Sequence, residues 1–212
     1  MNGFGETDAL ITTALKKPHI FGGLMIFDRN TQSEFERGDC CEAYLFMGCN
    51  LNERTGEAVF RVWAPKAKSV SVVGDFNNWD TKANPLNRAT NAGIWEGKIA
   101  EIKRYDNYKY YLETDKGGLY KSDPYAFHSE THEGTASKAY PLNAYKFTDD
   151  KYMSEKNDVY KKPVNIYECH IGSWRKYPDG NCYDYRKFAD EIVPYMKDMS
   201  YTHLELMGIA EY

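Results

Sequence analysis

Short strand-like segments recur along residues 51–145, with Gly, Pro, Asn and Asp residues between them. A spacing of about ten residues between such segments is typical of an antiparallel β-sandwich, because each strand crosses the domain once and the chain then turns back. The fold class expected for this part is therefore mainly β, an antiparallel immunoglobulin-like sandwich. Strands are expected at residues 58–63, 69–73, 94–100, 107–113 and 119–122.

The fourth expected strand has two chemically different faces. Tyr108 and Tyr110 fall on one face, whereas Lys109 and Tyr111 fall on the other. Successive side chains of a strand point to opposite faces of the sheet, so we expect the first face to build the core and the second to meet solvent or a ligand. Residues 115–118, Asp-Lys-Gly-Gly, are expected to join this strand to the next as a loose hairpin.

The strand at 69–73 ends at Gly74 and is followed by an Asn- and Asp-rich turn that carries Trp79. Indole offers the largest flat apolar surface of any side chain and also has a polar edge, so it can lie half-exposed at a recognition site. The apolar face of a glucose ring can stack on it. The alternative is that Trp79 plugs the end of the sandwich core, and spacing alone favours this alternative.

The pattern changes after residues 146–163, a polar segment that ends in Lys-Lys-Pro and indicates a linker. Residues 164–171 and 202–209 are short apolar runs. Between them, residues 185–199 have apolar side chains at helical spacing, and Asp184 is placed to cap the helix. Strand, helix and strand of these lengths predict a βαβ unit with parallel strands.

This βαβ unit cannot cover its own apolar surfaces. Its strands lack neighbours on their outer edges and it has only one helix, which indicates the start of a truncated (β/α)8 barrel. Exposed edges and an uncovered apolar face are expected to drive self-association through residues 164–212, or to leave these residues poorly ordered. Pro194 lies inside the helical segment and is expected to kink it, because proline removes one backbone hydrogen bond.

The residues before the sandwich pattern are expected to form a leader that packs on it. One short helix is expected within residues 1–20, where Thr7 can cap it and Pro18 can end it. The organisation expected for the whole chain is a leader at 1–50, a sandwich at 51–145, a linker at 146–163 and a βαβ unit at 164–212.

The charge and cysteine content of the chain limit the classes of binding partner and the cellular compartment that we expect. A net charge of -4 without a long Lys/Arg cluster argues against nucleic acid. Five cysteines, an odd number without a C-x-x-C pair, favour reduced thiols and a cytoplasmic location over a zinc or redox site. No secretory signal is recognisable, and no apolar run is long enough to span a bilayer. We therefore expect no membrane partner, no metal and no cofactor.

Four motifs follow one another along the sandwich: Phe-Arg-Val-Trp-Ala-Pro at 60–65, Gly-Asp-Phe-Asn-Asn-Trp at 74–79, Tyr-Lys-Tyr at 108–110 and Ser-Asp-Pro-Tyr-Ala at 122–126. Together they resemble the glucan-binding sandwich of carbohydrate-binding module family 48.

Two further motifs lie downstream: Asn-Ile-Tyr-Glu-Cys-His-Ile-Gly-Ser-Trp-Arg at 165–175 and Tyr-Thr-His-Leu-Glu-Leu-Met at 201–207. They resemble the first two barrel strands of the 1,4-α-glucan branching enzymes of glycoside hydrolase family 13. Isoamylase-type debranching enzymes and trehalohydrolases share the sandwich and the Tyr-Glu-x-His start of the barrel. The continuation Ile-Gly-Ser-Trp-Arg favours the branching type.

The resemblance implies an enzyme of glycogen synthesis that cleaves an α-1,4 glucan and transfers the fragment to a 6-hydroxyl. Such retaining chemistry needs one carboxylate as nucleophile and another as acid and base, carried at the ends of later barrel strands. None of the family's catalytic residues lies within residues 1–212, so this chain alone is expected to be inactive. The alternative is a non-catalytic module that binds α-glucan or supports the barrel.

The resemblance also assigns contact residues. The related module of the AMP-activated kinase β subunit contacts glucan at positions that correspond to Trp79, Lys109 and Tyr120, with Tyr120 replacing a tryptophan. His170 and Glu211 lie at the ends of the two barrel-like strands, where side chains line part of an active site. Close to them the sequence departs from the family, because residue 208 is glycine where proline is usual.

Overall fold

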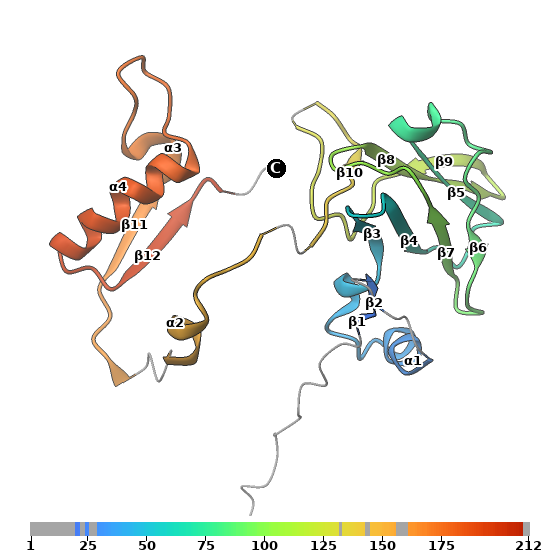
Figure 1. Cartoon of the computed structure of the whole chain (residues 1–212), viewed down its shortest axis with the longest axis horizontal. Coiled ribbons are helices and arrows are strands. Elements are labelled where there is room, and N and C mark those ends of the chain that lie inside the picture. Colours follow the sequence, from blue (N-terminus) through green and yellow to red (C-terminus); the bar gives the residue numbers. More distant parts are fainter. Residues whose placement is uncertain are drawn as a thin grey trace, which may run out of the picture. The chain divides into compact units, whose positions relative to one another are not determined.

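The computed structural model describes residues 20–21, 24–25, 29–131, 133–142, 145–155 and 161–209. They belong to two compact units, Met1–Lys146 and Phe147–Tyr212. The elements shown in Figure 1 are, in chain order, β1 (Ile20–Phe21), β2 (Leu24–Met25), α1 (Arg29–Arg37), the 3-10 helix η1 (Ala43–Leu45), β3 (Gly48–Asn52), β4 (Glu57–Trp63), β5 (Ser69–Gly74), the 3-10 helix η2 (Asp75–Asn77), β6 (Asn87–Arg88), β7 (Ile94–Ile99), β8 (Asn107–Thr114), β9 (Gly117–Lys121), β10 (Ser137–Lys138), α2 (Asp150–Glu155), β11 (Ile166–His170), α3 (Ile171–Trp174), α4 (Tyr185–Asp198) and β12 (His203–Met207).

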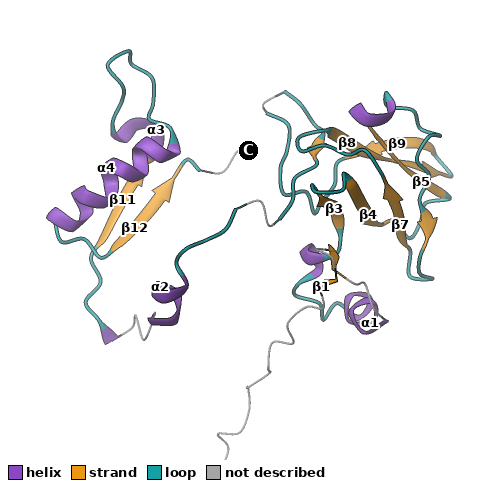
Figure 2. Ribbon diagram, in the orientation of Figure 1, coloured by secondary structure: helices purple, strands orange, loops and turns teal. Residues whose placement is uncertain are grey.

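The first unit contains a β-sandwich of two antiparallel sheets (Figure 2). One sheet has the strand order β3-β4-β7-β6. In the other sheet β8 pairs with β5 along one edge, with Val72 opposite Tyr110, and with β9 and β10 along its other edge. β8 is therefore the central strand of its sheet. The strands expected from the sequence at 58–63, 69–73, 94–100, 107–113 and 119–122 are confirmed as β4, β5, β7, β8 and β9.

Aromatic side chains from both sheets fill the space between them. Phe60, Tyr108 and Tyr110 are fully buried, and the rings of Phe60 and Tyr108 meet edge to face with centroids 5.2 Å apart. The indole of buried Trp95 donates a hydrogen bond to the carbonyl oxygen of Ala64 at 3.0 Å. The prediction that the Tyr108 and Tyr110 face of β8 builds the core is confirmed.

The hairpin between β8 and β9 is tighter than the sequence indicated. Thr114 pairs with Gly117, so the turn contains two residues instead of the four expected at 115–118. The Thr114 hydroxyl donates to the Gly117 carbonyl oxygen at 2.9 Å and accepts from the backbone N–H of Lys116 at 3.1 Å. Gly117 has a φ of +102°, which glycine adopts at no steric cost. These hydrogen bonds and the conformation of Gly117 make the turn tighter than the loose hairpin predicted from the sequence.

The strand β3 was absent from the predicted strands. Its sequence, Gly-Cys-Asn-Leu-Asn, is rich in residues that are depleted in strands, but continuous pairing with β4 overrides this local preference. The Asn50 amide donates to the carbonyl oxygens of Phe46 and Met47 at 2.9 Å and 3.2 Å and joins the strand to the preceding turn. The boundary expected at residue 50 therefore falls inside β3.

Part of the leader covers the outer face of the first sheet. Phe46 and Met47 are fully buried in one cluster with Ile94 of β7. Phe35 of α1 meets Phe46 edge to face, with ring centroids 5.8 Å apart. The short helix expected within residues 1–20 lies outside the described residues, whereas α1 formed in a charged stretch where no helix was predicted.

The second unit pairs β11 with β12 in parallel, as predicted, with Ile166 opposite His203. Its core consists of Cys169, Ile171, Phe188 and Ile192, which join the strands to α4. Figure 1 shows α4 lying along the two strands. The segment expected as a linker also contains the short helix α2, whose side chains are all exposed.

The helix α4 begins and ends close to the predicted positions. The Asp184 carboxylate accepts hydrogen bonds from the backbone N–H groups of Arg186 and Lys187, both at 2.9 Å, and caps the helix as expected. The helix continues through Pro194 to Asp198. Pro194 therefore does not end it.

Candidate binding site

The side chain of Asn77 holds the turn that follows β5. Its Oδ1 accepts a hydrogen bond from the backbone N–H of Gly74 at 2.9 Å. Its Nδ2 donates to the Val72 carbonyl oxygen at 2.9 Å and to Asn84 Oδ1 at 2.7 Å. Asn side chains often replace backbone partners in this way. The turn therefore has a defined shape.

Trp79 leaves this turn in a left-handed backbone conformation. Its φ is +60° and that of Asn78 is +52°, a region that costs a non-glycine residue roughly 1–2 kcal/mol. Its backbone N–H donates to the Gly74 carbonyl oxygen at 3.0 Å, and its indole N–H donates to Asp75 Oδ1 at 3.2 Å. The side chain is 36% exposed. The interpretation of Trp79 as a core plug is therefore wrong.

Asp75 connects the turn to the central strand of the sheet. Its Oδ1 accepts from Trp79, while its Oδ2 accepts from the backbone N–H of Asn107, the first residue of β8, at 2.9 Å. Lys109 follows two positions later. A Cβ atom at Gly74 would lie only 2.3 Å from the Asn107 carbonyl oxygen, so this close approach requires glycine. Trp79 is thus tied to the end of the strand that carries Lys109.

Lys109 and Tyr120 lie on the outer face of this sheet. The register places Tyr120 of β9 opposite Tyr111 of β8, which is two residues from Lys109. The rings of Tyr111 and Tyr120 have centroids 5.0 Å apart, and Tyr120 is 52% exposed. Lys109 Nζ donates to Thr135 Oγ1 at 2.5 Å. The face therefore presents an exposed ring near a positioned ammonium group.

Tyr111 is fixed on the same face. Its hydroxyl donates to Glu113 Oε1 at 2.8 Å, and this bond to a carboxylate raises the pKa of the phenol. A Cβ atom at Gly118 would lie 2.1 Å from the Tyr111 hydroxyl, so glycine leaves room for the ring. The ring that packs against Tyr120 is thereby held in one position.

The structure thus places Lys109 and Tyr120 on one face and anchors Trp79 at the end of the central strand of that sheet. Among the described residues, no hydrogen bond or ring contact joins Trp79 to Lys109 or Tyr120. Tyr111 and Thr135 are neighbours that the sequence analysis did not assign to the site. Alternation had already placed Tyr111 on the face of Lys109, whereas Thr135 lies in a polar stretch without a periodic pattern.

A buried carboxylate supports β8 from the core side. Asp123 Oδ2 accepts hydrogen bonds from the hydroxyls of Tyr108 at 2.6 Å and Tyr110 at 3.4 Å, and Oδ1 accepts from the backbone N–H of Tyr125 at 2.8 Å. Burial raises the pKa of Asp123, although these hydrogen bonds oppose the shift. The same burial and the nearby carboxylate raise the pKa values of both tyrosines well above the usual range. The outer face carrying Lys109 therefore rests on a rigid polar network.

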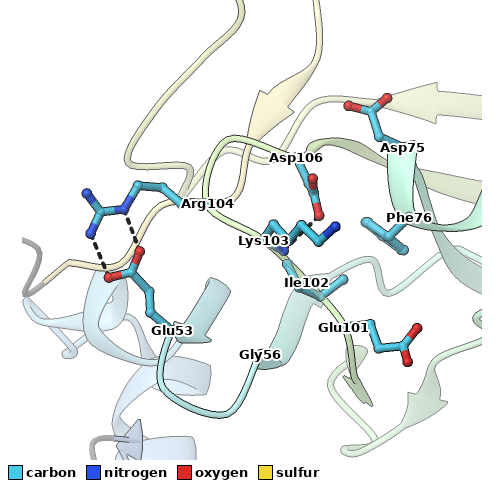
Figure 3. Close-up of a pocket in the computed structure, with 9 residues that line it drawn as sticks. All are labelled: Glu53, Gly56, Asp75, Phe76, Glu101, Ile102, Lys103, Arg104 and Asp106. Atoms are coloured by element: carbon cyan, nitrogen blue, oxygen red, sulfur yellow. Dashed lines mark hydrogen bonds and ion pairs between the residues drawn. The ribbon is translucent and has the colours of Figure 1, made fainter.

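Three loops enclose a cleft of about 760 Å³ at one end of the sandwich (Figure 3). We call it the end cleft; its lining residues are Glu53, Gly56, Asp75, Phe76, Glu101, Ile102, Lys103, Arg104 and Asp106. The loops are the β3–β4 turn, the β7–β8 loop and the η2 turn after β5. Figure 3 shows the ion pair of Glu53 and Arg104 on one side and Asp75 with Phe76 on the other.

Of the two predicted active-site lining residues, both in the second unit, the structure describes His170. His170 ends β11, and its Nδ1 lies 3.3 Å from Ser173 Oγ. Gly208 has a φ of +72°, which proline cannot adopt, and a Cβ atom there would lie 2.7 Å from His170 Nε2. Glycine at 208 therefore makes room for the imidazole. Glu211 lies outside the described residues, so its placement is untested.

Residues 46–126 match the sequence profile of carbohydrate-binding module 48, the isoamylase N-terminal domain. They include the turn carrying Trp79 as well as Lys109 and Tyr120. The chain is similar to 1,4-alpha-glucan branching enzymes, and within it this region is similar to carbohydrate-binding module 48. The fold and the four motifs of the sandwich agree with this similarity.

Two relatives illustrate the extent of the similarity. The 1,4-alpha-glucan branching enzyme GlgB of Fusobacterium nucleatum is 44% identical over 180 residues, which are 84% of this chain and 29% of that enzyme. The enzyme of the same name from Halothermothrix orenii is 47% identical over 184 residues, again 84% of this chain and 29% of the relative. The chain thus spans 29% of the length of these relatives.

Solved structures share the fold at lower identity. A putative alpha amylase from Salmonella typhimurium is similar with a TM-score of 0.56 and 20% identity, over 78% of this chain and 25% of that protein. The GBS pullulanase SAP in complex with maltotetraose is similar with a TM-score of 0.53 and 21% identity, over 78% of this chain and 24% of that one. The chain therefore shares its fold with parts of these two structures.

The described ranges contain neither a membrane-spanning helix nor a cluster of metal ligands. None of the helices there has the length and apolar character needed to cross a membrane. No group of three or more His, Cys, Asp or Glu side chains in those ranges is arranged to hold a metal ion.

Proposed function

We propose that the sandwich unit binds α-glucan through Trp79, Lys109 and Tyr120. The observation that carries the proposal is the presentation of Trp79. Its indole is exposed, its N–H is directed to Asp75, and its backbone holds a left-handed conformation that only a well-determined turn maintains. An exposed indole fixed in this way offers a flat apolar surface to a ligand.

The chemistry of the outer face suits a glucose polymer. The rings of Trp79 and Tyr120 can stack on the apolar faces of glucose units. Lys109 Nζ and Thr135 Oγ1, already hydrogen-bonded to each other, can exchange that bond for sugar hydroxyls. Sugar hydroxyls are neutral and need hydrogen-bond donors and acceptors. Lys109 supplies a donor and the Thr135 hydroxyl can act as either.

Native electrophoresis through glycogen-loaded and blank gels tests the proposal. We expect glycogen to retard the parent chain but not Trp79→Ala, and to retard Tyr120→Ala weakly. Trp63→Ala is the matched control, because Trp63 is also an exposed tryptophan, 56% accessible, but lies on the other sheet. Equal mobility of the parent and Trp79→Ala in glycogen would contradict the proposal and favour a support module without a ligand site.

We further propose that the chain forms part of a 1,4-α-glucan branching enzyme and is inactive alone. The support is the similarity to GlgB proteins, of which it spans 29% of the length. The retaining reaction needs two carboxylates flanking one glycosidic bond, and the resemblance assigns both to later barrel strands. New α-1,6 linkages formed in amylose by this chain alone would overturn the inactivity. His170 and Glu211 would line part of the active site of the whole enzyme.

We also propose self-association through residues 164–212. On the strands β11 and β12, Ile166 is 53% exposed and Met207 is 42% exposed, on the sheet face away from α4. A second copy of the same unit can cover these two exposed side chains and pair with the strand edges. A concentration-independent monomer in light scattering, together with protected amides in β11 and β12, would contradict it.

The proposed compartment is the cytoplasm. Cys40, Cys41, Cys49, Cys169 and Cys182 are all free thiols. Thiols that remain reduced, including the adjacent pair Cys40 and Cys41, are typical of a reducing compartment. Fractionation of cells that express the natural protein tests this directly.

A further inference from the structure

The end cleft shares one residue and one loop with the turn that presents Trp79. Asp75 lines the cleft and also accepts the indole N–H of Trp79. Loops gathered at one end of a β-sandwich form the usual position for a ligand site, because the sheets hold them rigidly while their sequences vary. The end cleft therefore lies next to the proposed glucan platform and is built from the same turn.

Most charged groups of the end cleft already have a hydrogen-bond partner within the chain. Glu53 and Arg104 form a bidentate ion pair, which lowers the pKa of the Glu53 carboxyl and raises that of the guanidinium. Asp106 Oδ2 accepts from the backbone N–H of Lys103 at 2.7 Å. In the described part of the chain, neither the Glu101 carboxylate nor the Lys103 ammonium has a hydrogen-bonding partner. One acceptor and one donor therefore remain available.

The apolar part of the end cleft is formed by Phe76 and Ile102. Ile102 is 2% exposed, and Phe76 packs against Phe60 with ring centroids 6.3 Å apart. Figure 3 shows Phe76 beside Asp75, with Glu101 on the same side of the cleft. Six of the nine residues that line the volume of about 760 Å³ are charged, so the cleft is mainly polar with a small apolar wall. Such a lining suits a ligand that has both hydroxyl groups and an apolar face.

Two further observations distinguish this end of the sandwich. Of the six non-glycine residues with positive φ in the described ranges, four lie here: Asn78, Trp79, Glu101 and Tyr105. Such strain clusters at ligand-binding sites. In addition, Asn107 Oδ1 is the single buried side-chain oxygen or nitrogen without a hydrogen-bond partner among the described residues, and Asn107 donates its backbone N–H to Asp75. A buried acceptor without a partner is unusual in a folded protein, and this one belongs to the residue whose backbone N–H holds Asp75.

We propose that the end cleft is a second subsite for a neutral sugar ring of the same α-glucan chain, reached across Asp75 from the Trp79 platform. This inference rests on the proposed function. The cleft offers donors, acceptors and an apolar wall together, which matches a pyranose. Four carboxylates and two cations line the cleft, and this excess of negative charge disfavours an anion. Among the described residues no group of three or more His, Cys, Asp or Glu side chains is arranged to hold a metal ion. The preferred ligand is therefore a glucan long enough to occupy both the platform and the end cleft.

Titration of the full 212-residue chain with maltotriose and maltoheptaose tests the second subsite. The cleft variant is Glu101→Met with Lys103→Met, which removes the available acceptor and donor without changing the net charge. The matched control is Lys68→Met with Asp115→Asn, which removes an exposed ion pair at the β8–β9 hairpin and also preserves the net charge. Thermal unfolding checks that each variant is folded.

We expect the cleft variant to lose about 3- to 10-fold in affinity for maltoheptaose and less than about twofold for maltotriose. Trp79→Ala is expected to lose affinity for both sugars, and the control for neither. In the parent, amide signals of residues 101–106 should shift with maltoheptaose but not with maltotriose.

Other outcomes separate the two proposals. If the cleft variant binds both sugars as the parent does, or loses affinity equally for both, the second subsite is overturned while the platform stands. If the parent binds neither sugar, the platform and the subsite are both overturned.

Discussion

Trp79 and Asp75 are joined by a hydrogen bond of 3.2 Å from the indole N–H to Oδ1. The other oxygen of the same carboxylate accepts the backbone N–H of Asn107 at 2.9 Å. Asp75 therefore fixes the edge of the indole and at the same time attaches its turn to β8. The orientation of the proposed stacking surface depends on one carboxylate.

Replacing Asp75 by Ala is expected to weaken glucan binding although Trp79 itself is still present. The indole loses its anchor and must be ordered by the ligand, so affinity for maltoheptaose should fall by about 2- to 10-fold. Isothermal titration calorimetry measures this. Asp80→Ala is the matched control, because Asp80 lies in the same turn and its carboxylate accepts only the backbone N–H of Lys82. Equal losses in both variants would show that the turn, and not the anchor, was damaged.

The buried carboxylate of Asp123 gives the sandwich a specific pH dependence. Its folded-state pKa is raised from the usual 3.8, chiefly by burial. The folded protein therefore holds this proton at a pH where the unfolded chain has released it, and the free energy of unfolding falls as pH rises between 3.8 and the folded-state pKa.

The variant Asp123→Asn lacks this proton, so its stability relative to the parent should increase as pH rises through that window. Urea unfolding followed at resolved amide signals of β5 and β8 measures it for the sandwich alone. Glu53→Gln, in the same unit, provides a control of opposite sign, because the hydrogen bond from Arg104 lowers the pKa of the Glu53 carboxyl. A constant difference between the parent and Asp123→Asn across the acid range would refute the prediction.

The periodicity of apolar residues and the residues that form turns and helix caps were sufficient to predict much of the fold. Alternation in β8 assigned Tyr108 and Lys109 to opposite faces, and Asp184 marked the start of α4, because both signals depend on local geometry alone. β3 could not be predicted in this way, since its Gly and Asn residues form a strand only through pairing with β4. In the candidate site, too, some residues could be predicted from the sequence and others could not.

Motif resemblance identified Trp79, Lys109 and Tyr120, but spacing alone favoured burial of Trp79. Its exposure depends on a left-handed φ and on the amide of Asn77, which bonds to Val72 and Asn84. The end cleft was invisible in the sequence, because Glu53, Asp75 and Lys103 come from three separate loops. Contacts between distant loops leave no periodic signal.

Gly208 is expected to position the ring of His170. In Gly208→Ala the new Cβ atom would lie 2.7 Å from His170 Nε2, so the imidazole must move. Gly180→Ala is the matched control, because Gly180 also has a positive φ, +88°, but nothing lies within 4 Å of the added Cβ atom. Both variants should lose about 1–2 kcal/mol from left-handed backbone strain. Only Gly208→Ala should shift the imidazole NMR signals of His170. Unchanged signals would show that Gly208 does not position this ring.

The cap of α4 should respond to pH in the direction opposite to Asp123. Backbone N–H bonds, the largest from Lys187, together with the Tyr177 hydroxyl, lower the pKa of Asp184 from its usual 3.8. The ionised cap therefore stabilises α4 above that pH, and the stabilisation is lost as pH falls toward the lower folded-state pKa. Asp184→Asn retains a capping side chain without the charge, so α4 amides should exchange faster than in the parent at pH 6 and at similar rates in strong acid. Asp198→Asn, at the negative end of the helix dipole, should slow exchange at pH 6 instead. Faster exchange in both variants would mean that charge at the helix ends does not govern α4.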